Sequence, residues 1–169
     1  MDLFSVTVPP LRRLTDAVPR LLSRFQHDSP LRARLAADGM AGGEHFCVAL
    51  GYVARTVLPL TGQAVPDQPC APDRAVILAL AVEMRALLSD LTPENFAGAE
   101  TRQISHAAGE ARLTQSGTDY ALLYALPNAQ FHLTLGYATL RMTGVLVGKG
   151  DLDGFHRYAP GTNFAASAD

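Results

Sequence analysis

The sequence predicts an all-α protein, an antiparallel four-helix bundle with a small β-hairpin before its last helix. Four stretches carry apolar residues every three or four positions, which is the spacing of one face of a helix. Short runs rich in glycine and proline separate these stretches. The chain has 169 residues, of which 48% are hydrophobic and 18% charged. It is therefore long and apolar enough to bury one core without a disulfide or a metal ion.

The first helix is expected to begin after the pair Pro9–Pro10 and to bend or restart at Pro19. Its buried face is a stripe of six apolar residues: Leu11, Leu14, Val18, Leu21, Leu22 and Phe25. A short connecting helix is expected within residues 31–37. The second long helix, at about 44–60, follows three glycines that we expect to break the chain: Gly39, Gly42 and Gly43.

The third helix is expected to begin near Asp73 and to end before Pro93. Partial alternation of polar and apolar residues in 101–105 and 110–115 predicts the small hairpin. A long fourth helix is expected from the start of 116–119 to about Thr143, with Pro127 in its middle. We therefore expect one bundle domain over residues 1–147 and an irregular C-terminal tail over 148–169.

Charge and cysteine content exclude several classes of protein. With a net charge of −2, the chain lacks the excess of basic residues that proteins use to bind nucleic acid. The two cysteines, Cys47 and Cys70, form no CxxC pair, so we expect neither a disulfide framework nor a thiolate zinc site. We interpret Cys47 as a small buried apolar residue. Neither a secretory leader nor an apolar run long enough to cross a membrane is visible. We expect a soluble, cytoplasmic protein.

A polar stripe on the fourth helix is the main candidate site. Four polar residues recur every fourth position among leucine and alanine: Tyr120, Tyr124, Asn128 and His132. In one interpretation they line a site in the bundle core, with His45 facing them from the second helix, and two imidazoles from different helices hold zinc, nickel or iron. In the other, the tyrosine and histidine tips reach water, and Asn128 satisfies a backbone group freed by Pro127.

Three further titratable residues are weaker candidates. Glu83 lies at the edge of the third helix, where it is expected to be solvated rather than to supply a carboxylate ligand. His106 and His156 fall in a predicted loop and in the tail, and both are expected to be solvated.

The chain resembles an uncharacterised bacterial family, labelled only as a domain of unknown function and grouped with the DinB/YfiT-like four-helix bundles. The resemblance covers about residues 5–151 and rests most specifically on Ala125-Leu126-Pro127-Asn128 followed by Phe131-His132. Other matching segments include 117–120, Tyr137-Ala138, Gly144-Val145 and Gly148-Lys149. It implies an up-down-down-up bundle that is often dimeric.

The wider superfamily to which this resemblance points includes metal-dependent enzymes, several of which act with low-molecular-weight thiols. Their metal is typically held by one histidine on the second helix and two histidines four residues apart on the fourth. His132 matches the later of these two, Asn128 stands at the earlier one, and His45 lies near the second-helix position. Members with the same signature usually have histidine at Tyr124 and glutamine near His45, so a three-histidine site cannot be assembled from this sequence.

Three functions follow as hypotheses. The first is an uncharacterised DinB-like protein that binds a small molecule in a core pocket between the second and fourth helices, beside Tyr120, Tyr124, Asn128 and His132. The second is a metal-dependent or degenerate enzyme that uses a divalent ion held by His45 and His132. The third is a non-catalytic structural or interaction protein, a homodimer. No nucleic-acid or membrane partner is expected, and the sequence does not decide whether the protein is an enzyme.

Overall fold

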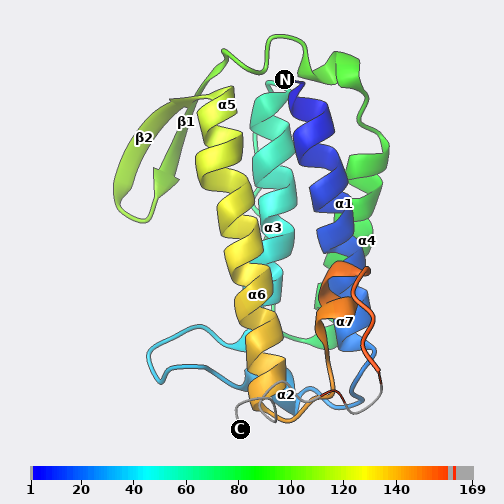
Figure 1. The fold of residues 1–169 in the computed structure, drawn as a ribbon. Coiled ribbons are helices and arrows are strands. Elements are labelled where there is room, and N and C mark those ends of the chain that lie inside the picture. Colours follow the sequence, from blue (N-terminus) through cyan, green and yellow to red (C-terminus); the bar gives the residue numbers. More distant parts are fainter. Residues whose placement is uncertain (1, 160–161, 163–169) are drawn as a thin grey trace, which may run out of the picture.

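Four long helices lie side by side in the computed structural model, which describes residues 2–159 and residue 162. They are α1 (Leu3–Leu22), α3 (Gly42–Leu60), α4 (Arg74–Ser89) and α6 (Leu126–Met142). Figure 1 shows α1 and α6 running in one direction and α3 and α4 in the other, with α3 in contact with the other three. The predicted all-α bundle is therefore confirmed.

Helix α1 begins eight residues earlier than the sequence pattern predicts. Asp2 caps it, because its carboxylate accepts hydrogen bonds from the amides of Phe4 and Ser5. Pro9 and Pro10 lie inside the helix instead of before it. Both prolines are exposed, so the two carbonyls that they deprive of a partner lie on the outer side of the bundle, and the helix continues.

The glycines before α3 belong to the helix and not to a break in the chain. Gly42 and Gly43 are its first two residues, and Glu44 caps it by accepting a hydrogen bond of 2.5 Å from the amide of Ala41. A Cβ at Gly43 would lie 2.8 Å from Pro72, and one at Gly42 would lie 3.0 Å from Thr139. Glycine is therefore needed at both positions for close packing. The sequence predicts a break in the chain here, because it does not show which residues pack against a glycine.

The last long helix is interrupted by a wider turn. It begins as α5 (Gly117–Asp119), continues as the π-helical segment η2 (Tyr120–Ala125) and ends as α6. The Leu126 amide donates to the carbonyl of Ala121, five residues back, directly before Pro127. The hydrogen-bond register thus changes from i→i−4 to i→i−5 directly before the proline, which has no N–H to donate. The sequence, in contrast, predicts an α-helix with a kink at Pro127.

The predicted hairpin is present and packs beside η2 (Figure 1). Strands β1 (Gln103–Ala108) and β2 (Ala111–Ser116) pair antiparallel, with Gln103 opposite Ser116 and Ala108 opposite Ala111. Gly109 has a φ of +60° in the turn, a conformation that favours glycine. The shorter helices are α2 (Ser29–Arg32) and η1 (Pro93–Phe96).

The two cysteines form a disulfide, so the expectation of unbonded cysteines is wrong. After α3 the chain returns along the bundle, which brings Cys70 back to Cys47 with a Cα–Cα distance of 5.7 Å. Sequence spacing did not reveal this approach, because the connection has no regular structure. Disulfides form and persist in oxidising compartments and are rare in the reducing cytosol.

The expected irregular tail contains a short helix, α7 (Lys149–Asp153), packed against α1. Asp151 accepts hydrogen bonds from the Arg24 guanidinium, and its carbonyl accepts one from Arg20. These contacts order a segment without periodicity of its own. The remaining part of the predicted tail, residues 160–161 and 163–169, lies outside the described residues.

Within the described ranges, none of the helices has the length and apolar content that a bilayer crossing requires.

Candidate functional site

Two histidines meet where α3 crosses α6. The Nδ1 atoms of His45, in the first turn of α3, and His132, in the middle of α6, are 2.9 Å apart. His45 is buried with 6% of its surface exposed, and His132 is half-buried. The structure therefore brings together the two residues that the sequence places on different helices as candidate ligands.

Both histidines resist protonation. Burial lowers the pKa of His45, partly opposed by the carboxylate of Glu44. Burial also lowers the pKa of His132 to about 4, with further contributions from His45 and Arg55. At neutral pH both rings are uncharged, so one Nδ1 carries a hydrogen and donates it to the other.

The histidine pair begins a row of six contacting rings along the seam between α3 and η2–α6. We call this the ring row; its members are His45, His132, Tyr52, Tyr124, His106 and Tyr120. The ring of Tyr52 stacks on His132 with an interplanar angle of 22°. Tyr124 follows Tyr52 at a centroid distance of 6.1 Å. Of the residues on the predicted stripe, Tyr120, Tyr124 and His132 therefore share one site.

Tyrosine hydroxyls connect the row to the backbone. Tyr52 donates to the hydroxyl of Tyr124 at 3.3 Å, and Tyr124 donates to the carbonyl of Ala107 at 3.2 Å. Tyr120 donates to the carbonyl of Arg55 at 2.6 Å. Burial raises the pKa of Tyr52, and burial also raises the pKa of Tyr120 to about 12. These two tyrosines are thus uncharged at neutral pH.

The hairpin contributes His106, which the sequence pattern wrongly left in a solvated loop. Its ring lies 4.2 Å from that of Tyr124 and 4.9 Å from that of Tyr120, measured between centroids. Its Nε2 is 2.8 Å from the side-chain oxygen of Gln115, while its Nδ1 is buried without a hydrogen-bond partner in the described part of the chain. Buried polar atoms are nearly always hydrogen-bonded, so the Nδ1 atom of His106 is available to a hydrogen-bonding group of a ligand.

Asn128, the remaining residue of the predicted stripe, lies outside the ring row and bonds to its own helix. Its side-chain nitrogen donates to the carbonyl of Tyr124 at 2.7 Å, one turn back on its own helix. Its acceptor is the carbonyl of Tyr124 and not that of Leu123, which lies four residues before Pro127 and is the one that the proline leaves without an amide donor.

The residues present do not fit a metal centre with three protein ligands. Among the described residues there is no group of three or more histidine, cysteine, aspartate or glutamate side chains that could hold an ion. Glu83 is exposed on α4, and Cys47 is bonded to Cys70. His45 and His132 supply two imidazoles, one fewer than catalytic zinc sites use.

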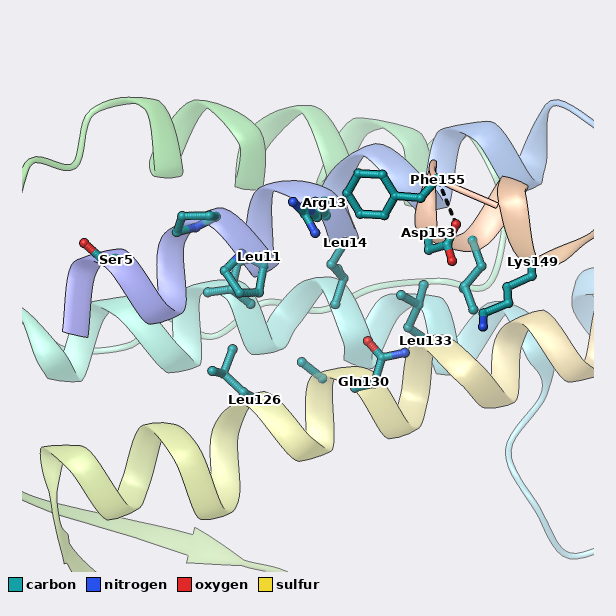
Figure 2. Close-up of a pocket in the computed structure, with 14 residues that line it drawn as sticks. Ser5, Leu11, Arg13, Leu14, Leu126, Gln130, Leu133, Lys149, Asp153 and Phe155 are labelled. Carbon is teal, nitrogen blue, oxygen red and sulfur yellow. Dashed lines mark hydrogen bonds between the residues drawn. The ribbon is translucent and has the colours of Figure 1, made fainter. Parts of the chain in front are cut away.

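A cavity of about 620 Å³ lies on another side of α6, between α6 and α1. Its lining includes Leu11, Leu126 and Leu133 but none of the four residues of the predicted stripe. The sequence predicts a pocket between the second and the fourth long helices, where the ring row lies, whereas this cavity lies between the first and the fourth (Figure 2).

Acid should destabilise the fold through His132. Its pKa is about 4 in the folded protein against an ordinary value of 6.5, so the unfolded chain binds the proton more tightly. The stabilisation is complete above pH 6.5 and is lost as the pH falls toward 4. Because the ring is half-exposed and solvent screens it, we expect a loss of about 1–2 kcal/mol. Urea unfolding at pH 7 and at pH 4.5 measures this loss.

The matched variants for this experiment are His132→Phe and His27→Gln. His132→Phe keeps a ring in place and removes the titrating group, so it should lose about 1–2 kcal/mol less stability than the parent between the two pH values. His27 is exposed in the loop after α1, and its variant should behave like the parent. An unchanged pH dependence in His132→Phe would contradict the assignment.

Comparison with known proteins adds two similarities. A family profile described as "Domain of unknown function (DUF1993)" matches residues 3–152. The fold is similar to the crystal structure of a DinB family member protein from Shewanella denitrificans, with a TM-score of 0.82 and 27% sequence identity. That match covers 93% of this chain and 94% of the other. No curated protein matches the chain.

Proposed function

The chain belongs to the DUF1993 family and has a DinB-like fold, and from this premise we propose that it binds an uncharged planar aromatic molecule at the ring row. The observation that carries the proposal is the histidine pair, two neutral imidazoles held 2.9 Å apart, with the ring of Tyr52 stacked on His132. Planar rings bind such a row by offset stacking and by contact with ring edges.

The charge of the site supports an uncharged ligand. Burial lowers the pKa of His45 and His132 and raises the pKa of Tyr52 and Tyr120, so these four rings offer donors and acceptors without charge at neutral pH. The Arg55 guanidinium lies 5.3 Å from the centroid of the Tyr52 ring. A cationic ligand would be repelled by Arg55 and would find no carboxylate in the row to offset its desolvation.

Three rings of the row are partly exposed. His132 and Tyr124 of the last long helix are half-buried, as is His106 on the hairpin, whereas Tyr52 and Tyr120 are 6% and 3% exposed. A ligand would therefore contact the first three rings directly, and the two buried tyrosines would hold those rings in position.

Benzamide and benzamidine test this proposal because they share a shape and differ in charge. Titration of each into the protein, followed by the ring resonances of His132 and Tyr124 in NMR spectra, should show saturable shifts with benzamide and at least about tenfold weaker binding of benzamidine. Tyr124→Phe removes the hydroxyl that donates to Ala107 and should weaken the binding of benzamide about tenfold. Tyr137→Phe, on the same helix but outside the row, should leave it unchanged.

Equal binding of the two probes, or benzamide shifts confined to residues outside the row, would overturn the proposal. So would a Tyr124→Phe variant that binds benzamide as the parent does.

A divalent metal at the histidine pair is the second candidate, and one observation favours it. Two uncharged imidazole nitrogens from different helices converge on each other, and neutral imidazole is the form that binds zinc and nickel. With two protein ligands we expect weak binding. An increase in melting temperature with zinc or nickel that is lost in His132→Phe supports it, and no increase in the untagged parent argues against it.

A further inference from the structure

The chain between α3 and α4 runs back along the length of the bundle. Because α3 and α4 point in the same direction (Figure 1), residues 61–73 return from the end of α3 to the opposite end, where α4 begins. We call this segment the strap. Fully extended it reaches about 43 Å, whereas α3 is about 28 Å long. The strap therefore has slack, and its middle can move away from the bundle while both of its ends stay in place.

Both ends of the strap are fixed by side chains from other segments. Where the strap leaves α3, the guanidinium of Arg102 donates to the carbonyl of Leu60. Where the strap enters α4, Arg74 donates to the carbonyl of Leu22 and pairs with Asp28 at 3.3 Å. These contacts hold the two helix ends without any contribution from the middle of the strap.

The middle of the strap has few contacts of its own. Within the part of the chain that the structure describes, residues 64–72 take part in no hydrogen bond between backbone groups. Their side chains are exposed except those of Gln68, Cys70 and Pro72, which are half-buried. A segment without a hydrogen-bonded backbone has little stability of its own, so these three side chains determine whether the strap stays on the bundle.

The three attachments differ in strength. The Nε2 atom of Gln68 lies 3.8 Å from the Sδ atom of Met84 on α4, which is a weak polar contact. Pro72 packs against Gly43 of α3 by van der Waals contact. The third attachment is the covalent bond to Cys47 of α3, and a reductant breaks it without changing any other group. The strap is thus held across the seam between α3 and α4 mainly by a bond that depends on redox conditions.

The strap shields two sulfur-containing side chains from solvent. Met84 is 1% exposed, and its thioether contacts Gln68 of the strap. Cys47 is 7% exposed and is bonded to the strap directly. Cys70 is the more accessible half of the disulfide, since it is half-buried. Movement of the strap away from α3 and α4 would bring the sulfur atoms of Met84 and Cys47 into contact with water.

We propose that the strap is a redox-operated cover, closed over the seam between α3 and α4 when the disulfide is formed and open when it is reduced. In the open state the Cys47 thiol and the Met84 thioether are exposed on an otherwise intact bundle. The ring row lies between α3 and α6, so this proposal does not depend on the proposed function.

A dithiol supplies the two electrons of the reduction. Its first thiolate attacks the Sγ atom of Cys70, because Cys47 is the less accessible sulfur. The bond between the two cysteines breaks, and Cys47 leaves as a thiolate that takes up a proton. The second thiol of the reductant then attacks the mixed disulfide, which releases Cys70 as a thiol and leaves the reductant as a disulfide.

Nitrogen-15 relaxation of the strap amides measures the opening, with dithiothreitol as the dithiol. The order parameters of Gln68 and Ala71 should be about 0.8 in the oxidised protein and fall below about 0.6 on reduction, while those of α3 and α4 stay near 0.85. In a Cys47→Ala, Cys70→Ala double variant, the strap amides should be mobile without reductant and should not respond to dithiothreitol.

Oxidation by hydrogen peroxide, followed by mass spectrometry, measures the exposure of Met84. The double variant is used because it has no thiol that consumes peroxide. Sulfoxide should form at Met84 about tenfold faster in this variant than in the oxidised parent. Met142 is 52% exposed on α6 and should react equally in both. Leu140→Ala removes a fully buried side chain from α6 and keeps the disulfide, so it destabilises the whole fold and should leave Met84 protected.

A strap that becomes mobile on reduction, over helices that stay rigid, together with faster oxidation of Met84 in the double variant, supports the proposal. Strap order parameters that reduction leaves unchanged, or a Met84 that stays protected in the double variant, would overturn it. So would equally fast oxidation of Met84 in Leu140→Ala, because global unfolding would then explain the exposure. Loss of the helical circular dichroism on reduction would also overturn it, since the strap would not open separately from the fold.

Discussion

Replacing Phe46 with alanine should lower the free energy of unfolding by about 3–5 kcal/mol. Phe46 is fully buried on α3, where its ring lies against the backbone of α6 at Gly136. The substitution leaves a cavity at the most extensive helix–helix contact of the fold, and neighbouring atoms can fill it only in part. Urea unfolding measures the loss. Phe131→Ala removes the same ring from an exposed position on α6 and should cost less than about 1 kcal/mol.

The reciprocal change tests the same contact from the other helix. A Cβ at Gly136 would lie 2.6 Å from the Phe46 ring, so Gly136→Ala alone should cost about 1–3 kcal/mol. Combined with Phe46→Leu it should cost less than the sum of the two single changes. Strict additivity, or equal costs of Phe46→Ala and Phe131→Ala, would contradict this packing.

This contact also sets the geometry of the candidate site. His45 directly precedes Phe46, and His132 lies one turn before Gly136. The close approach of the helices at the glycine therefore brings the two imidazoles within hydrogen-bond distance. Gly136→Ala should separate the pair and move the pKa of His132 upward, toward its ordinary value.

Removing the disulfide should lower the free energy of unfolding by about 3 kcal/mol. Cys47 and Cys70 are 23 positions apart, and opening this loop in the unfolded chain restores conformational freedom that favours unfolding. The measurement compares urea unfolding of the oxidised parent with that of a Cys47→Ala, Cys70→Ala double variant.

The reduced parent is the control for packing, because it keeps both side chains and loses only the bond. It should be destabilised nearly as much as the double variant. Two thiols that react with a thiol reagent in the native, unreduced protein, or a reductant that leaves stability unchanged, would contradict the disulfide.

The sequence predicts the long helices well because each carries an apolar stripe of its own. In α4 the regular spacing of Ile77, Leu80 and Met84 corresponds to a buried face. Helix ends were predicted less well, because they depend on contacts from elsewhere in the chain. Gly43, for example, packs against Pro72, and no local pattern distinguishes such a glycine from a breaker.

The sequence likewise predicts only the part of the candidate site that follows from helical spacing. The stripe on the last helix and His45 were visible, since helical spacing places them toward the core. Tyr52 was missed, although it lies two turns after His45 on the same helix and that spacing was available in the sequence. His106 could not be placed, because only the packing of the hairpin on η2 brings its ring to Tyr124. The register change before Pro127 likewise has no signature in local periodicity.

Nitrogen NMR of the histidine rings is the most direct test of the uncharged, hydrogen-bonded pair of His45 and His132. At neutral pH we expect both rings to be neutral, one of them to carry its hydrogen on Nδ1, and a coupling across the bond between the two Nδ1 atoms. On acidification His132 should titrate with a pKa of about 4. Two histidines that titrate independently near 6.5, with no coupling between them, would show that the pair does not form.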